Sequence, residues 1–162
     1  MALIKNDSLR MGVSFGITSA IITTLGLMVG LNSGTGSRMV VLGGILTIAI
    51  ADAFSDALGI HITEESEGEH SSKEIWQSTI FTFLAKLIFA LTFVIPVLLF
   101  TLSNAVIINI VWGLSVLGVF SFMIAKGQKE SPFKVVSEHL VIAVLVLLIT
   151  NYLGEWIAKT FN

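Results

Sequence analysis

The sequence predicts an all-α integral membrane protein, a bundle of five transmembrane helices that forms a single domain over residues 1–162. Composition is the first reason: 54% of the residues are hydrophobic and only 12% are charged, whereas a soluble domain carries about 25% charged residues. The mean hydropathy of +0.92 agrees with this. The second reason is five apolar runs, each about as long as the roughly 20 residues that a helix needs to cross a bilayer core. They lack the alternation of barrel strands.

The five apolar runs are separated by short polar connections. The turn-rich sequence NSGTGSR follows the first run, and an acidic segment at about residues 63–74, expected to be a loop, follows the second. A tight turn joins the third run to the fourth, and Pro132 interrupts the connection before the fifth. The runs cover residues 11–31, 39–62, 75–100, 105–125 and 135–157.

The distribution of Lys and Arg predicts the orientation, because short cytoplasmic loops carry more of these residues than external ones. With five spans, six basic residues fall on the side of the N-terminus and two on the other side. We therefore expect the N-terminus, the acidic loop and the Pro132 loop in the cytoplasm, and the C-terminus outside. The six are Lys5, Arg10, Lys73, Lys126, Lys129 and Lys134, and the two are Arg38 and Lys159.

Small residues form a stripe along the first run. At about 100° per residue they fall within a narrow arc, which lets another helix approach closely. Packing within one chain and dimerisation are both compatible with the pattern. The stripe consists of Gly12, Gly16, Ser19, Thr23, Gly26 and Gly30.

Two aspartates lie inside the second apolar run. Asp52 and Asp56 are four residues apart, so they share one helical face, and Ser55, Gly59 and Thr63 are expected to extend the same stripe toward the cytoplasmic end. An acid at the centre of a spanning helix costs about 2.5–3.5 kcal/mol, so we expect both carboxylates to face the protein interior or a water-filled path. A buried ion pair or a helix cap is the structural alternative. An ionisable residue within a span is a functional candidate by default, and we favour that interpretation.

The chemistry of the pair indicates a cation site. Carboxylate and hydroxyl oxygens suit hard or borderline divalent cations, and neighbouring carboxylates bind protons with split affinities. We expect a divalent cation that exchanges with protons, as transported substrate rather than as cofactor. Lys86 in the third run is the expected counter-charge. Neutralising an aspartate and being displaced by an entering metal are both compatible with its position.

The acidic segment after the second run has two interpretations, a solvated loop or a mouth that concentrates cations next to the aspartates. Glu67 with His70, or Glu65 with Glu69, can share a metal if the helix continues beyond the membrane. His61 lies about half a turn from the Asp52 face and is expected to be interfacial rather than a ligand. The candidate metal ligands of the segment are Glu64, Glu65, Glu67, Glu69 and His70.

Other function classes find no support. The formal net charge of -2 argues against nucleic acid as a partner. The absence of cysteine excludes disulfides, thiolate metal sites and cysteine nucleophiles. The sequence motifs of phosphate-binding loops, dinucleotide-binding folds, serine hydrolases and zinc proteases are missing. We therefore expect neither enzymatic activity nor a cofactor.

The chain resembles the vacuolar iron transporter family over nearly its whole length. ADAFSDALGIHITEESE is similar to the family pattern Ala-Asp-Gly-x-Ser-Met-x-x-Gly-Glu-Tyr-x-Ser, through Asp52, Ser55 and Gly59. GVSFGITSAIITTLGLMVGL, TFLAKLIFALTFVIPVLLF with its Pro96, and KGQKESPFK leading to NYLGEWI resemble further family segments. The resemblance implies a five-helix homodimer that moves ferrous iron or manganese out of the cytosol in exchange for protons.

Three positions depart from the family pattern. Phe15 stands at its first-helix aspartate, Asp56 at its second-helix methionine and Ile60 at its glutamate. An all-oxygen site favours manganese, magnesium or calcium over softer metals. The long cytoplasmic insertion of eukaryotic members is missing, and we expect a protein of the cell (inner) membrane of a prokaryote. A non-transporting scaffold or regulatory protein, favoured by Phe15 and Ile60, and a passive cation channel stay as alternatives.

Overall fold

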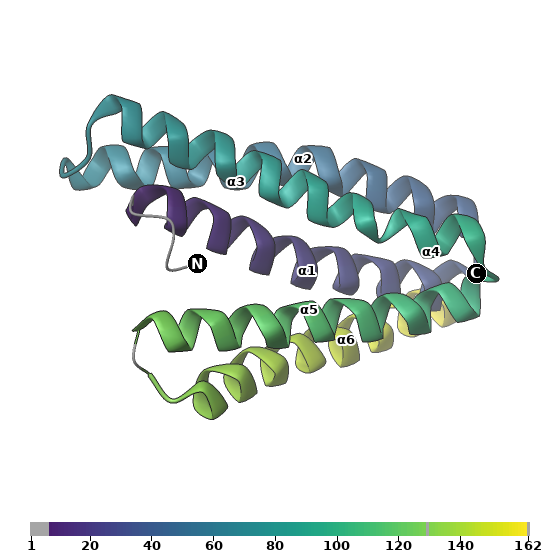
Figure 1. The fold of residues 1–162 in the computed structure, drawn as a ribbon. Coiled ribbons are helices and arrows are strands. Elements are labelled where there is room, and N and C mark those ends of the chain that lie inside the picture. The colour runs from purple at the N-terminus through teal and green to yellow at the C-terminus, as the bar shows by residue number, and fades with distance from the viewer. Residues whose placement is uncertain (1–6, 129, 162) are drawn as a thin grey trace.

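The structure, a computed structural model, describes residues 7–128 and 130–161. These residues form six helices and no strand. Because α3 and α4 together make one span, the described chain has five helical segments long and apolar enough to cross a membrane (Figure 1). The all-α fold is therefore confirmed, and the protein is an integral membrane protein. The helices are α1 (Asp7–Thr35), α2 (Arg38–Glu67), α3 (Ser72–Thr92), α4 (Val94–Leu99), α5 (Leu102–Gln128) and α6 (Pro132–Phe161).

The connection between α2 and α3 is shorter than the acidic loop expected over residues 63–74, and it covers only residues 68–71. Gly68 ends α2 with a φ of 68°, a left-handed conformation that glycine adopts without strain. Ser71 opens α3 with a capping box: its Oγ accepts from the Glu74 backbone N–H, and its own N–H donates to Glu74 Oε2 at 2.9 Å. The first half of the acidic segment therefore continues α2 as helix.

A kink at Phe93 separates α3 from α4. Pro96 has no N–H to donate to the carbonyl of Thr92, so the helix loses one backbone hydrogen bond there. Asn109 of α5 supports the kink, because its buried Nδ2 donates to the Phe93 carbonyl at 2.9 Å. The third span is thus continuous across the bundle but changes direction near one end.

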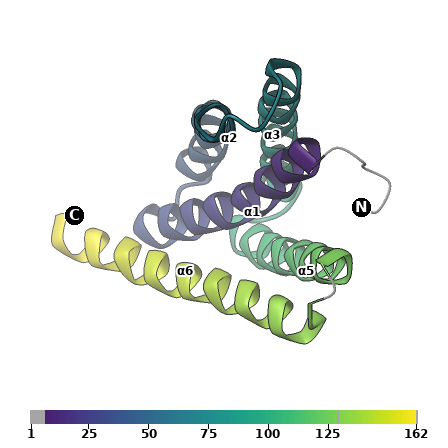
Figure 2. The same cartoon turned by 90° about the vertical axis from the view of Figure 1, so that its left-hand side faces the viewer.

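Helix α1 lies at the centre of the bundle, between the α2–α3 pair and the α5–α6 pair (Figures 1 and 2). Its small-residue stripe is occupied within the chain. A side-chain carbon added at Gly16 would lie 2.7 Å from the Thr82 carbonyl of α3, and one at Gly26 would lie 2.8 Å from the Val146 side chain of α6. Of the two interpretations of the stripe, the structure supports packing within one chain.

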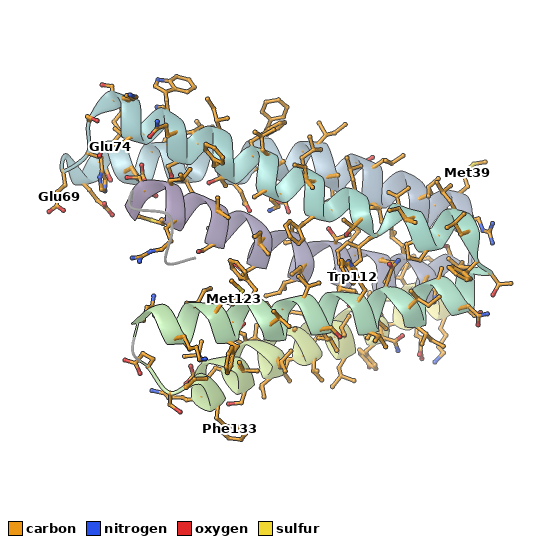
Figure 3. All side chains as sticks on the ribbon, in the orientation of Figure 1. Met39, Glu69, Glu74, Trp112, Met123 and Phe133 are labelled. Atoms are coloured by element: carbon orange, nitrogen blue, oxygen red, sulfur yellow. The ribbon has the colours of Figure 1, made fainter. Side chains whose placement is uncertain are left out.

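Large apolar side chains point outward along the helices, as expected of a surface in lipid (Figure 3). They are most frequent on α6, which is the least buried of the five spans. The starts of α1 and α3 and the end of α2 share one end of the bundle, and α6 ends at the opposite one (Figure 1). Which end faces the cytoplasm stays a prediction, and Lys5 and Lys129, used for it, lie outside the described residues.

Candidate functional site

A cluster of charged and polar side chains lies near the middle of α1, α2 and α3. Lys86 of α3 is at its centre and only 1% of its side chain is exposed. Its Nζ lies 2.5 Å from Asp52 Oδ2, contacts Asp56 Oδ2, and donates to Ser19 Oγ at 2.8 Å. The two aspartate side chains are 24% and 17% exposed. A buried ammonium therefore touches two carboxylates that each keep a route outward.

The two aspartates are held differently. Asp56 Oδ2 accepts from both Lys86 Nζ and Ser19 Oγ, the latter at 2.6 Å. Asp52 Oδ2 has the short distance of an ion pair to Lys86 but not the geometry of a hydrogen bond. Asp52 is thus the more exposed and the less constrained of the two, whereas Asp56 is fixed by a serine and a lysine.

Small residues allow the cluster to form. The four-residue spacing brings Asp52 and Asp56 to the same side of α2, beside the buried alanines Ala53 and Ala57 that let α2 approach its neighbours. Across the bundle, Gly16 of α1 sits against the backbone of α3 next to Lys86, one turn before Ser19. A side-chain carbon at Gly16 would lie 2.7 Å from the Thr82 carbonyl and 3.3 Å from the Lys86 backbone nitrogen, so a larger residue there requires α1 and α3 to move apart.

The charges of the cluster do not cancel. Two carboxylates and one ammonium leave one negative charge in excess when all three are ionised. Isolated charge in a low-dielectric span is costly, so a further positive charge, a proton or a cation, stabilises this arrangement. The geometry therefore suits a site that binds an additional cation.

The predicted ligand Ser55 does not touch Lys86, since it is exposed on the neighbouring side of α2. It belongs to a stripe of small or polar residues that are all exposed in the single chain and that recur every four residues. A side-chain carbon added at Gly43 or Gly59 in this stripe would meet nothing within 4 Å. The stripe runs directly beside the two aspartates. It consists of Gly43, Thr47, Ala51, Ser55, Gly59 and Thr63.

The acidic residues near the α2–α3 connection divide into exposed and buried groups. Glu65, Glu67 and Glu69 are exposed. His70 Nε2 lies 3.8 Å from Glu67 Oε2, and His70 Nδ1 lies 3.2 Å from Ser8 Oγ of α1. Within the described residues, no three acidic or histidine side chains come together as a metal would require. These residues suit an electrostatic mouth better than a fixed metal centre.

Two features of this region were not predicted from the sequence. The sequence places Ser19 only in the small-residue stripe of α1, yet its hydroxyl bonds with both Asp56 and Lys86. The sequence does not distinguish Glu64 from the other acids of the segment, yet its side chain is 0% exposed. A hydroxyl residue such as Ser19 within a span, opposite a helix that carries an ionisable residue, is the sequence signal for the Ser19 contacts. The signal for the burial of Glu64 is its position on the same side of the helix as the buried residues Ala57 and Ile60.

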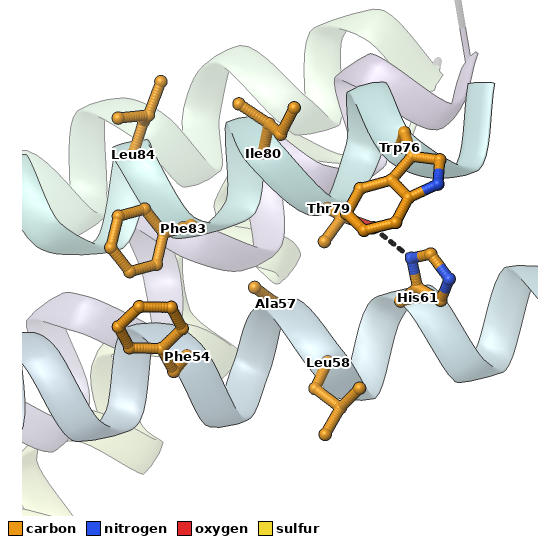
Figure 4. A pocket seen from close by; sticks show the side chains of 9 residues that line it. All are labelled: Phe54, Ala57, Leu58, His61, Trp76, Thr79, Ile80, Phe83 and Leu84. Atoms are coloured by element: carbon orange, nitrogen blue, oxygen red, sulfur yellow. Dashed lines mark hydrogen bonds between the residues drawn. The ribbon is translucent and has the colours of Figure 1, made fainter. Parts of the chain in front are cut away.

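A separate groove of about 410 Å³ lies between α2 and α3 (Figure 4). Its lining is mostly apolar, with Phe54 and Phe83 facing each other at one end and His61 and Trp76 at the other. Thr79 uses its single hydroxyl hydrogen for the Ile75 carbonyl, so His61 Nδ1 is the donor in the 2.9 Å bond to Thr79. The groove has no acidic lining residue. His61 of α2 therefore contributes to the packing of α2 against α3, through Thr79 and Trp76.

Comparison of the chain with protein-family models and with curated proteins gives no match.

Proposed function

We propose that the protein is a divalent-cation transporter in which Asp52 and Asp56 bind the cation and Lys86 is an internal positive charge that the cation replaces. One observation carries the proposal. A buried lysine lies between two partly exposed carboxylates in the middle of three membrane spans. Such intramembrane charges are costly, and they typically mark substrate or ion pathways.

Charge balance links the cation to protons. With Lys86 charged and no cation bound, the cluster carries one negative charge. A divalent cation with Lys86 still charged would bring it to one positive charge. Loss of one proton as the cation binds would make the cluster neutral, which is the least costly state in a membrane. Exchange of a cation for at least one proton follows from this balance.

The donor set favours hard cations. Carboxylate and serine oxygens suit manganese, magnesium or calcium. The resemblance to the vacuolar iron transporter family adds ferrous iron to these candidate cations. It also supports export from the cytosol, with the α2–α3 connection at residues 68–71 on the cytoplasmic side. In this orientation the exposed acids beside His70 would concentrate cations near the site. No enzymatic step is part of the proposal.

A homodimer completes the proposal. The exposed stripe on α2 has the small side chains at four-residue spacing that helix pairs use to approach closely in membranes. A second copy packed on it would cover the exposed sides of Asp52 and Asp56 and add oxygen ligands to a site that has few in one chain. The stripe of α2, rather than that of α1, is therefore the proposed dimer surface.

Flux measurements in reconstituted vesicles test the function. We expect the wild type to move manganese, ferrous iron or magnesium, faster with a pH gradient than without one. Asp52→Asn and Asp56→Asn keep the size of the side chain and remove one ligand charge, so each should reduce flux by about tenfold or more. Glu130→Gln, at an exposed position between α5 and α6, is the matched control and should keep wild-type flux.

The outcomes separate the alternatives. Folded wild-type protein without flux would indicate a scaffold or regulatory protein. Cation flux that is independent of the pH gradient and is not accompanied by proton movement would indicate a passive channel. Wild-type flux in both aspartate variants would refute the site.

A further inference from the structure

The apolar groove between α2 and α3 faces outward, toward the lipid. Three of its lining residues, Leu58, Trp76 and Ile80, are 57%, 58% and 50% exposed. The small side chain of Ala57 leaves space between the larger residues of the two helices (Figure 4). Apart from His61 and Thr79, which bond to each other, and the Trp76 indole N–H, the lining is hydrocarbon. The groove therefore offers an apolar chain far more contact than it offers water.

The groove has the length of one membrane leaflet. On α3 it extends from Trp76 to Leu84, eight residues, which is about 12 Å at 1.5 Å per residue. One leaflet accounts for about 15 Å of the roughly 30 Å hydrocarbon core. Trp76 lies about one turn inside the start of α3 at Ser72, and tryptophan is enriched at the level where hydrocarbon meets water. The groove thus runs from the interface toward the middle of the membrane, as a lipid acyl chain does.

Both walls of the groove become charged beyond its outer end. On α2, Glu65 lies four residues beyond His61, on the same helical face. On α3, Lys73 lies seven residues before Ile80, again on the same face. Both charged side chains are exposed, and neither has an ion-pair partner among the described residues. One unpaired positive charge and one unpaired negative charge therefore continue the two apolar walls.

Trp76 places a hydrogen-bond donor between the apolar and the charged parts. Its indole nitrogen lies on the side of the ring away from Phe54 and Phe83, toward the outer end of the groove (Figure 4). This nitrogen can only donate, and it has no hydrogen-bond acceptor among the described residues. An indole at a membrane interface typically directs its N–H to a polar group of the lipid.

We propose that the groove binds a zwitterionic phospholipid with an ammonium headgroup, drawn from the leaflet at the α2–α3 connection. One acyl chain fills the groove, the indole N–H of Trp76 donates to an ester carbonyl, the phosphate pairs with Lys73, and the ammonium pairs with Glu65. The proposal concerns a site apart from the Asp52–Asp56 cluster and does not depend on cation transport.

Charge complementarity decides the class of headgroup. Residues 65–74 contain four glutamates and one lysine, Lys73. An anionic phospholipid would find one positive charge among several negative ones, and like charges repel at this range. A headgroup that carries a phosphate and an ammonium can pair with both Lys73 and Glu65, and ammonium N–H groups form charge-assisted hydrogen bonds with a carboxylate.

The groove stays open to lipid in the proposed dimer. Gly59 of the exposed α2 stripe follows Leu58 of the groove directly, so the two residues point about 100° apart around the helix. A second copy packed on the stripe therefore covers another side of α2.

Quenching of Trp76 fluorescence tests the site in the full chain. Trp112→Phe with Trp156→Phe leaves Trp76 as the single tryptophan. Bromine atoms on an acyl chain quench an indole that they touch. In detergent micelles, we expect brominated phosphatidylethanolamine to quench Trp76 with a saturating curve, at about a fivefold lower mole fraction than brominated phosphatidylglycerol. Quenching that rises in proportion to the brominated lipid without saturating, or that is equal for the two lipids, overturns the proposal.

Variants of the two charges test the headgroup contacts. Lys73→Gln should raise the half-saturating mole fraction of both lipids about fivefold, since one lysine at a membrane surface contributes about this factor. Glu65→Gln should raise it for phosphatidylethanolamine alone. Lys134→Gln and Glu130→Gln, at exposed positions at the start of α6 and before it, are the matched controls and should change neither curve. Unchanged curves in both Lys73→Gln and Glu65→Gln overturn the proposal.

Native mass spectrometry tests the acyl-chain groove with all tryptophans of the protein in place. Ile80→Trp fills the groove from an exposed position, so this variant should retain less phosphatidylethanolamine than the wild type. Leu145→Trp on α6 is the matched control, because Leu145 and Ile80 are both 50% exposed and only Ile80 lines the groove. Equal retention of the lipid by Ile80→Trp and Leu145→Trp overturns the proposal.

Discussion

Replacement of Lys86 by methionine tests the cation cluster most directly. Methionine keeps most of the length and apolar stem of lysine and removes the ammonium. Asp52 and Asp56 then lie side by side without the positive charge that touches both of them. Removing one partner of a buried ion pair costs about 3–5 kcal/mol, because the remaining charge is left uncompensated. We expect Lys86→Met to lower the free energy of unfolding by about this amount in cation-free detergent.

A divalent cation should restore the stability of this variant. It supplies the missing positive charge, and a ligand at 100 times its dissociation constant stabilises the folded state by about 2.7 kcal/mol. Without a competing ammonium, Mn²⁺ should bind Lys86→Met more tightly than wild type, by about tenfold for each 1.4 kcal/mol of competition removed. Release of the cation in exchange for protons should be slower, because no ammonium remains to displace it.

Thermal unfolding followed by tryptophan fluorescence, with and without Mn²⁺, measures both effects, and calorimetric titration gives the dissociation constant. Lys159→Met is the matched control, since Lys159 is 77% exposed and pairs with Glu155 only on the surface at 3.4 Å. Such exposed pairs contribute about 0–1 kcal/mol. Equal stability of Lys86→Met and wild type without cation, together with equal Mn²⁺ shifts, would refute the role assigned to Lys86.

Two further predictions concern packing and topology. Gly16→Leu should destabilise the fold by about 1–3 kcal/mol or more, because its side chain meets the Thr82 carbonyl, whereas Gly59→Leu, in open space, should leave monomer stability unchanged and weaken only a dimer. Unfolding and cross-linking in detergent measure these effects, and equal behaviour of the two variants would contradict the packing assigned to each stripe. A reporter near Gly68 should read as cytoplasmic and one placed beyond α6 as external; the same location for both reporters would contradict five alternating spans.

The number of membrane spans and their helical structure can be predicted from the sequence, because the length of an apolar run is a local property of the chain. The aspartate pair and Lys86 could also be singled out, since charge within an apolar run is conspicuous in the sequence. The true ends of α2 and α3 had local signals as well. Gly68 and the Ser71–Glu74 capping box mark a short connection inside what resembles one acidic loop.

The remaining features depend on tertiary packing. Glu64 and Glu65 are adjacent residues of the same type, and only the packing of α2 against its neighbours makes Glu64 buried and Glu65 exposed. The stripes of small residues on α1 and α2 have similar spacing, yet α1 is central and its stripe is filled by α3 and α6. A sequence pattern shows that a helix can be approached closely, but the number and position of its neighbours decide what approaches it.

The central position of α1 sets the order in which the protein can assemble. The ribosome makes α1 before the helices that enclose it, and about 100 residues separate α1 from α6, whose Thr150 and Gly154 cover Gly30 and Gly34. During synthesis, the face of α1 that carries Gly30 and Gly34 therefore stays uncovered in the membrane or the translocon until α6 has been made. Insertion of α6 closes that surface last. A chain that stalls before α6 therefore leaves Gly30 and Gly34 of α1 without the helix that covers them in the folded protein.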